Sequence, residues 1–188
     1  MNWNNTSTEY GAVTKFFHWT VFLLFFYQFV VARTMLAITQ ADSVLGFTQD
    51  VMYNWHKSVG IVLFSIILFR YAWKRVTRLP DWAATLSDGE KKLIHGYERL
   101  FYLAMFVMPL SGYLHVMAGG YGVMFFGRWA LPNPIGKIEW LGLIGKYTHL
   151  VTGWVILIAV LLHVGLVLKH QLIQRDRLLM RMWPFTRQ

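Results

Sequence analysis

Apolar residues gather in four stretches, and polar or glycine-rich segments separate them. The stretches run approximately over residues 16–36, 55–73, 93–116 and 147–168. A helix needs about 20 mainly apolar residues to cross the hydrocarbon core of a bilayer. The pattern therefore predicts an all-α, integral membrane four-helix bundle that occupies residues 1–188 as a single domain.

The connection over residues 118–146 differs from the other two. It is rich in glycine and proline and carries several aromatic residues, whereas residues 74–92 are strongly charged. Long loops without structure of their own are uncommon in compact domains. We therefore expect residues 118–146 to lie in the membrane interface as a short helix or a re-entrant cap.

The composition agrees with a membrane setting and limits the chemistry. Hydrophobic residues make up 56% of the chain, charged residues make up 14%, and there is no cysteine. The lack of cysteine excludes disulfides, iron–sulfur clusters, thiolate-ligated haem and covalent haem attachment. A redox metal in this protein must be held by histidine, methionine, tyrosine or carboxylate.

The cations predict the orientation, because Lys and Arg in short loops are retained on the cytoplasmic side. Thirteen fall on one side of the predicted bundle and five on the other, so both termini are expected to be cytoplasmic. The net charge of +9 needs no nucleic-acid partner, since topology and anionic lipid headgroups account for it. The thirteen are Lys15, Arg70, Lys74, Arg75, Arg78, Lys91, Lys92, Arg99, Lys169, Arg175, Arg177, Arg181 and Arg187, and the five are Arg33, Lys57, Arg128, Lys137 and Lys146.

Two histidines in the last apolar stretch suggest cofactor binding. His149 and His163 are fourteen residues apart, so on a helix they share a face and are separated by roughly 21 Å along its axis. Neutral imidazole is the commonest metal ligand in proteins, and ionisable residues inside a membrane are candidates for function. One helix is therefore expected to hold two cofactors at different depths.

Partners for these histidines are available at both depths. His18 and His95 lie near the cytoplasmic ends of their predicted helices, and His56 lies at the outer end. His115 is also at the outer end, but it adjoins the glycine-rich connection and is expected to be interfacial. His170 follows the apolar run directly, where a headgroup contact and a functional role are both open.

Two glycines and an arginine favour a flat macrocycle over a bare metal ion. Gly60 and Gly153 each follow a histidine by four residues and so share its helix face, which leaves room for a haem. Close helix packing is the alternative for both glycines. Arg70 lies fourteen residues after His56, where it can bind a haem propionate or extend to the membrane interface.

These residues carry a family resemblance. The chain resembles the bacterial cytochrome b561 family of four-helix di-haem membrane proteins and, more distantly, the cytochrome b subunits of membrane-bound formate dehydrogenases and nickel–iron hydrogenases. The resemblance covers nearly the whole chain, and the histidine spacing in the last helix is its most specific element. Its motifs are His18-Trp19, His56 to Gly60, Arg70, Pro109, Gly112, His149, His163, His170 and residues 178–184.

The resemblance implies two haems b in a multi-pass protein of the bacterial inner membrane. It implies ligation by His18 with His163 on the cytoplasmic side, and by His56 with His149 on the outer side. Some members look like superoxide oxidases, which pass electrons from periplasmic superoxide to ubiquinone. The corresponding expectation is a superoxide:ubiquinone oxidoreductase with lipid, quinone and superoxide as its partners.

The residues add a physical reason for that activity. Two axial imidazoles leave no open position on the iron, so electrons should enter and leave at the haem edges. Lys57 and Lys146 flank the outer ligands, with Arg128 and Lys137 in the outer loop, and such cations can steer a small anion. Ordinary headgroup contacts are the alternative for each of these cations.

The electron acceptor and the biological setting stay open at this stage. His95, His170 and Lys15 gather at the cytoplasmic end, where a quinone headgroup needs hydrogen bonds and protons. The same four ligands would also serve a haem-bearing anchor subunit with a dehydrogenase or hydrogenase partner. A structural or metal-binding membrane protein without redox function is the third alternative.

Overall fold

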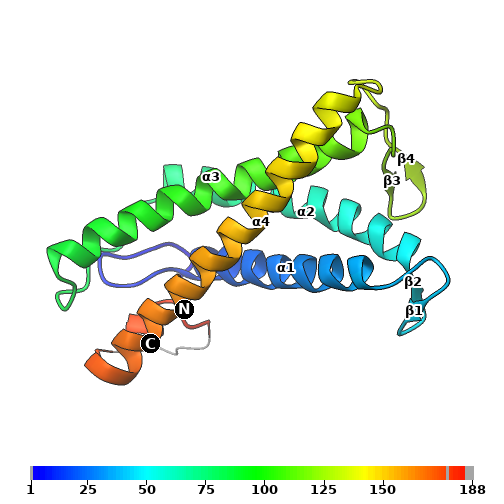
Figure 1. Cartoon of the computed structure of the whole chain (residues 1–188). Helices are drawn as coiled ribbons and strands as arrows, with labels where there is room; N and C mark the ends of the chain where they lie inside the picture. Colours follow the sequence, from blue (N-terminus) through cyan, green and yellow to red (C-terminus); the bar gives the residue numbers. More distant parts are fainter. Residues whose placement is uncertain (1, 177, 185–188) are drawn as a thin grey trace. The chain divides into compact units, whose positions relative to one another are not determined.

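The structure is a computed structural model that describes residues 2–176 and 178–184, and it is mostly helical (Figure 1). The prediction of an all-α membrane protein with four helices is confirmed. Each helix begins before its predicted apolar stretch, and α1, α2 and α3 also end after it. The helices are α1 (Ala12–Ala37), α2 (Gln49–Val76), α3 (Asp88–Ala118) and α4 (Glu139–Leu168).

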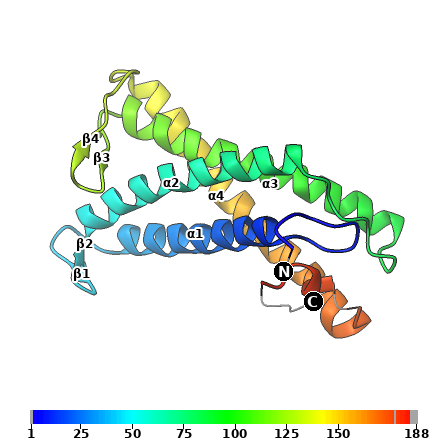
Figure 2. The same ribbon diagram turned by 180° about the vertical axis from the view of Figure 1, so that it is seen from behind.

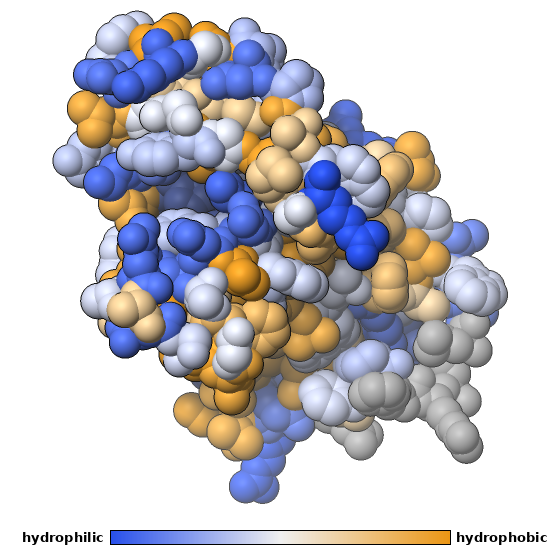
Figure 3. Space-filling model, turned by 90° about the vertical axis from the view of Figure 1, so that its right-hand side faces the viewer, coloured by the Kyte–Doolittle hydropathy of each residue, from blue (hydrophilic) through white to orange (hydrophobic). Residues whose placement is uncertain are grey.

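Among the described residues, three helices are long and apolar enough to cross a membrane: α1, α3 and α4 with the turn that follows it. The predicted span over residues 55–73, in α2, is not among them, because Lys57 and Arg70 limit its uncharged part. Many large apolar side chains are exposed, including Phe26, Leu103 and Leu161. Figure 3 shows orange apolar surface between blue polar side chains on one face. Such exposure suits contact with lipid.

Two short β-hairpins connect the helices. Strands β1 (Ser43–Val44) and β2 (Phe47–Thr48) join α1 to α2, and Leu45 and Gly46 between them have φ of 52° and 80°. Two residues with positive φ are typical of a type I′ turn. Strands β3 (Met124–Phe125) and β4 (Trp129–Ala130) lie between α3 and α4.

The second hairpin corrects the expectation of a short helix or re-entrant cap over residues 118–146. Phe126 and Gly127 turn the chain with φ of 47° and 68°. Positive φ is incompatible with a continuing right-handed helix and is what glycine adopts most easily. The glycines that marked this segment as unusual therefore form turns, and α4 begins only at Glu139.

The chain divides into two compact units, and each contains a part of all four helices. Unit 1 comprises residues 1–20, 66–105 and 154–188, and unit 2 comprises residues 21–65 and 106–153. Ile67 and His170 are fully buried in unit 1, and Ser58 and Met117 are fully buried in unit 2. The candidate ligands are divided between the units in pairs.

The two terminal segments lie side by side within unit 1 (Figures 1 and 2). The Arg181 guanidinium donates to the carbonyl oxygen of Thr8 at 2.9 Å and to that of Asp81 at 2.7 Å. Trp19 Nε1 donates to the carbonyl oxygen of Met182 at 2.9 Å. Both ends of the chain therefore meet at the same end of unit 1.

Of the cations used to predict orientation, Arg177 and Arg187 lie outside the described residues.

Candidate functional site

In unit 2, the structure brings His56 of α2 and His149 of α4 together. Their ring centroids are 6.1 Å apart, and the ring planes are nearly perpendicular at 85°. His149 Nδ1 lies 2.8 Å from the carbonyl oxygen of Met108, so this nitrogen carries the proton and donates. The unprotonated nitrogen of His149 is then Nε2. Fixing one ring nitrogen in this way is how proteins prepare the other to bind a metal.

Glycine in α3 makes room for the His149 ring. A Cβ at Gly112 would lie 2.8 Å from both Cε1 and Nδ1 of His149, too close for any side chain. The structure places Gly60 next to Gln28 Nε2 at 3.1 Å and Gly153 next to Met108 Cε at 3.4 Å. Spacing along one helix pointed to Gly60 and Gly153 and could not reveal Gly112, because it lies on a different helix.

In unit 1, the structure brings His18 of α1 and His163 of α4 together. Their ring centroids are 6.3 Å apart, with an interplanar angle of 54°. Phe101 packs edge-on against His163 at 5.9 Å, and Arg70 Nη2 lies 3.5 Å from His18 Nδ1. Within residues 2–176 and 178–184, no carboxylate forms an ion pair with Arg70. A half-buried guanidinium beside the histidines is thus available to an anion.

Both pairs fit a metal ion held between two imidazoles. Imidazole nitrogens bind metals at about 2.0–2.1 Å, so two rings that would hold one ion between them would have centres roughly 6 Å apart. The observed separations are 6.1 and 6.3 Å. In the described part of the chain, no cluster of three or more His, Asp or Glu residues could hold a metal. The pairs therefore suit a macrocycle that supplies the remaining ligands itself.

Comparison with known proteins agrees with this geometry. Residues 9–185 match the prokaryotic cytochrome b561 family. The chain belongs to this family. It is 24% identical over 182 residues to cytochrome b561 homolog 2 of Escherichia coli (strain K12), with 97% of this chain and 95% of that protein covered. This cytochrome b561 family member is accordingly a bacterial membrane electron-transfer protein, and haem b is the cofactor of its family.

The two competing histidines make other contacts than the four paired histidines. His95 packs edge-on against Trp82 with ring centroids 5.1 Å apart, and its side chain is exposed. His115 Nδ1 lies 3.0 Å from the carbonyl oxygen of Gly142, and its ring contacts Tyr121. The geometry therefore favours His18 over His95 as the partner of His163 in this cytochrome.

His170 is fully buried, which does not fit a solvated headgroup contact. Its Nδ1 lies 2.6 Å from Asp176 Oδ2, and its Nε2 lies 3.3 Å from Glu90 Oε1 without hydrogen-bond geometry. Burial raises the pKa of Asp176, but hydrogen bonds from His170, Thr85 and the Leu178 backbone N–H bring it below its ordinary value. Helical spacing could not reveal this cluster, because a π-helix over Lys169–Gln174 changes the register.

The outer-loop cations all belong to unit 2, as does the His56–His149 pair. Lys57 Nζ donates to the carbonyl oxygen of Gly122 at 3.1 Å, and Lys146 is exposed beside Tyr147. Lys137 Nζ lies 3.7 Å from Glu139, which offsets its charge, and Arg128 is exposed. Apart from Arg33 of α1, the cations of this unit that form no ion pair among the described residues are therefore Lys57, Lys146 and Arg128.

Proposed function

We propose that this cytochrome binds two haems b, one through His56 and His149 and the other through His18 and His163. The observation that carries the proposal is the separation of the rings, 6.1 and 6.3 Å, in two separate units. Support comes from the hydrogen bond that leaves His149 Nε2 unprotonated, and from His56 Nδ1, which is buried without a hydrogen-bond partner. Haem b at these sites would supply one-electron transfer.

Three further residues are proposed to accommodate the macrocycles. Arg70 lies beside His18 without a carboxylate partner, so its guanidinium is suited to a propionate. Gly60 and Gly153 follow the unit 2 ligands on the same helix faces and present no side chain there. Their nearest side-chain neighbours, Gln28 and Met108, are flexible and can move when the site is filled.

The reaction that we propose is the oxidation of superoxide coupled to the reduction of ubiquinone. Two superoxide ions, one ubiquinone and two protons give two dioxygen molecules and one ubiquinol. Two histidines at each site leave no position for a substrate to coordinate, so electron transfer without oxygen activation is expected. We further propose that both termini face the cytoplasm of a bacterial inner membrane, as the cation distribution predicts.

Superoxide is proposed to arrive at the surface of unit 2. Lys57 and Lys146 lie in α2 and α4, the helices that also carry His56 and His149, and Lys57 Nζ donates to the carbonyl oxygen of Gly122. A positive field of this kind raises the rate at which an anion meets the surface by a factor on the order of 10–10³. These two lysines are the proposed catalytic residues of the outer side.

Ubiquinone is proposed to react in unit 1, where His95 and His170 are the candidate contacts. His95 is 59% exposed and can meet a headgroup directly. His170 is enclosed by Glu90 and Asp176, so a headgroup would reach it only after one of these carboxylates moved. His95 is therefore the better candidate of the two.

The test measures the reduction of the purified holoprotein by superoxide at several ionic strengths. Because salt screens exposed charges over about 8 Å at physiological ionic strength, the rate should fall as salt is added. The variant Lys57→Gln with Lys146→Gln should be several-fold slower than the wild type at low salt. The matched control, Lys91→Gln with Lys92→Gln, loses the same charge in unit 1 and should keep the wild-type rate.

Other outcomes would replace the proposal. A di-haem protein that superoxide cannot reduce, but that accepts electrons from a co-purifying dehydrogenase, would make the chain an anchor subunit. A folded, colourless protein that binds no haem on reconstitution would leave a structural role without redox chemistry.

A further inference from the structure

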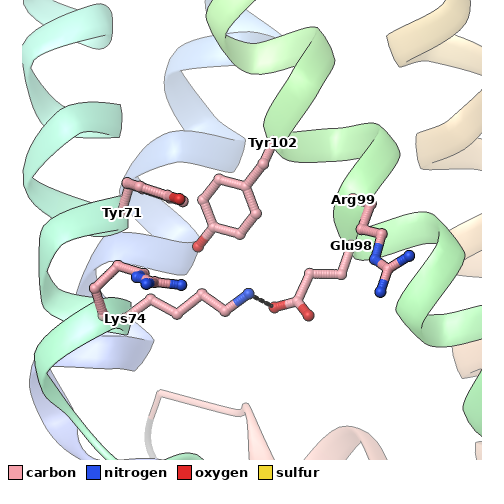
Figure 4. A pocket seen from close by; sticks show the side chains of 6 residues that line it. Tyr71, Lys74, Glu98, Arg99 and Tyr102 are labelled. Carbon is pink, nitrogen blue, oxygen red and sulfur yellow. Dashed lines mark ion pairs between the residues drawn. The ribbon is translucent and has the colours of Figure 1, made fainter.

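A polar groove lies in unit 1 between α2 and α3, on surface that the haem sites do not use (Figure 4). Its cavity has a volume of about 380 Å³. Three lining residues come from one face of α2 and three from one face of α3, since each set has helical spacing. They are Tyr71, Lys74 and Arg75, with Glu98, Arg99 and Tyr102.

The groove carries positive charge that the protein does not neutralise. Lys74 Nζ lies 2.5 Å from Glu98 Oε1 and 4.8 Å from the centre of the Tyr102 ring, so its charge is already paired. Arg75 and Arg99 form no ion pair within residues 2–176 and 178–184. Two exposed guanidinium groups, one from each helix, therefore line the groove without an acidic partner among the described residues, and the Lys74–Glu98 ion pair lies between α2 and Arg99 (Figure 4).

The surroundings of the groove are amphipathic. Tyr71 and Tyr102, whose rings are 5.3 Å apart, line it, and tyrosine is a residue type enriched at membrane interfaces. Further toward the middle of the two helices, Leu68, three residues before Tyr71, is 46% exposed, and Leu103, four residues after Arg99, is 63% exposed. A soluble anion would contact only the cations, whereas a phospholipid would also cover these apolar side chains.

We propose that the groove binds the phosphate headgroup of an anionic phospholipid, with Arg75 and Arg99 on the phosphate and Leu68 and Leu103 against the acyl chains. Arginine binds phosphate through two parallel hydrogen bonds, which a facing pair can supply from both sides. Basic pockets between membrane helices are typical sites for anionic headgroups. The proposal is independent of what the two histidine pairs bind.

The experiment titrates delipidated, full-length holoprotein in detergent with phosphatidylglycerol or phosphatidylcholine and counts bound lipids by native mass spectrometry. The variant Arg75→Gln with Arg99→Gln is compared with Arg78→Gln and Lys92→Gln, which removes two cations outside the groove. Each interfacial cation contributes roughly a fivefold factor to the binding of an anionic lipid. We expect the groove variant to bind phosphatidylglycerol about 25-fold more weakly and the control within about twofold of wild type.

A charge-preserving variant and a competition sharpen the result. Arg75→Lys with Arg99→Lys should lose only part of the affinity, because lysine keeps the charge without the bidentate geometry. Millimolar inorganic phosphate should fail to displace phosphatidylglycerol from the wild type. Displacement would assign the groove to a soluble anion instead. Equal binding of the two lipids to the wild type, or equal losses in the groove and control variants, would also overturn the proposal.

Discussion

The two histidine pairs have nearly the same ring separation but different surroundings. In unit 2, His149 is oriented by the backbone, because it donates to the Met108 carbonyl oxygen and lies against the bare backbone of Gly112. In unit 1, side chains do this work, since Phe101 packs on His163 and the Arg70 guanidinium lies beside His18. The groups that orient His149 therefore belong to the main chain. The groups beside His18 and His163 are side chains, which single substitutions can remove.

This difference has consequences for two haems in one protein. A backbone acceptor fixes the tautomer and orientation of His149, which makes the unit 2 site rigid. A guanidinium adds positive charge near the unit 1 site and favours the form that has gained an electron. If both pairs bind haem, the unit 2 site should be sensitive to packing and the unit 1 site to charge.

Removing one histidine of α4 should have the largest effect. His149→Ala should remove the haem of unit 2 alone, and His163→Ala the haem of unit 1 alone, because each loses an axial ligand. Haem content per protein should fall from two to one in both variants. His95→Ala and His115→Ala are the controls, and both should retain two haems. Two low-spin haems in either α4 variant would refute the pairing.

A methyl group at Gly112 should have the next largest effect. The added Cβ would meet the His149 ring at 2.8 Å, and overpacking of this kind costs about 1–3 kcal/mol. Gly112→Ala should lower thermal stability and alter the electron paramagnetic resonance signal of the unit 2 haem only. Gly96→Ala on the same helix is the matched control, because no atom lies within 4 Å of its Cβ. An unaltered signal in Gly112→Ala would show that the close approach is unimportant.

Gly112 illustrates a kind of contact, between two different helices, that local sequence patterns do not predict. Helical periodicity was enough to predict four helices and to place His149 and His163 on one face, because both follow from local geometry along one chain segment. It could not choose between His18 and His95, which share a depth, because that choice depends on how different helices face one another. The family resemblance includes Gly112, but its contact with the His149 ring depends on how α3 packs against α4.

Local patterns also failed where the backbone leaves the regular helix. Residues 124–130 form a hairpin instead of a short helix, and Gly120, Gly122, Gly127 and Gly136 make turns with positive φ. For His170, which follows the apolar run, the sequence leaves a headgroup contact and a functional role both open. After the π-helix, the chain reverses direction at Arg175, whose backbone is left-handed. Asp176 is thereby placed against the imidazole of His170.

Replacing Arg70 should have the smallest effect of the three changes and should act on unit 1 alone. Arg70→Gln removes a half-buried positive charge near His18, so the midpoint potential of that haem should fall by on the order of 50 mV. Arg70→Lys keeps the charge and should keep most of the potential. Redox titration followed by visible absorption resolves the two haems. A shift confined to the unit 2 haem would reverse the comparison between the sites.

The central claim is that each unit holds one haem between two histidines. Its most direct test is the haem content of the purified wild-type protein together with its electron paramagnetic resonance spectrum in the oxidised state. The account predicts two haems b per chain, both low-spin, with two distinguishable signals because their surroundings differ. One haem per chain, or a high-spin signal from an iron with an open axial position, would contradict it.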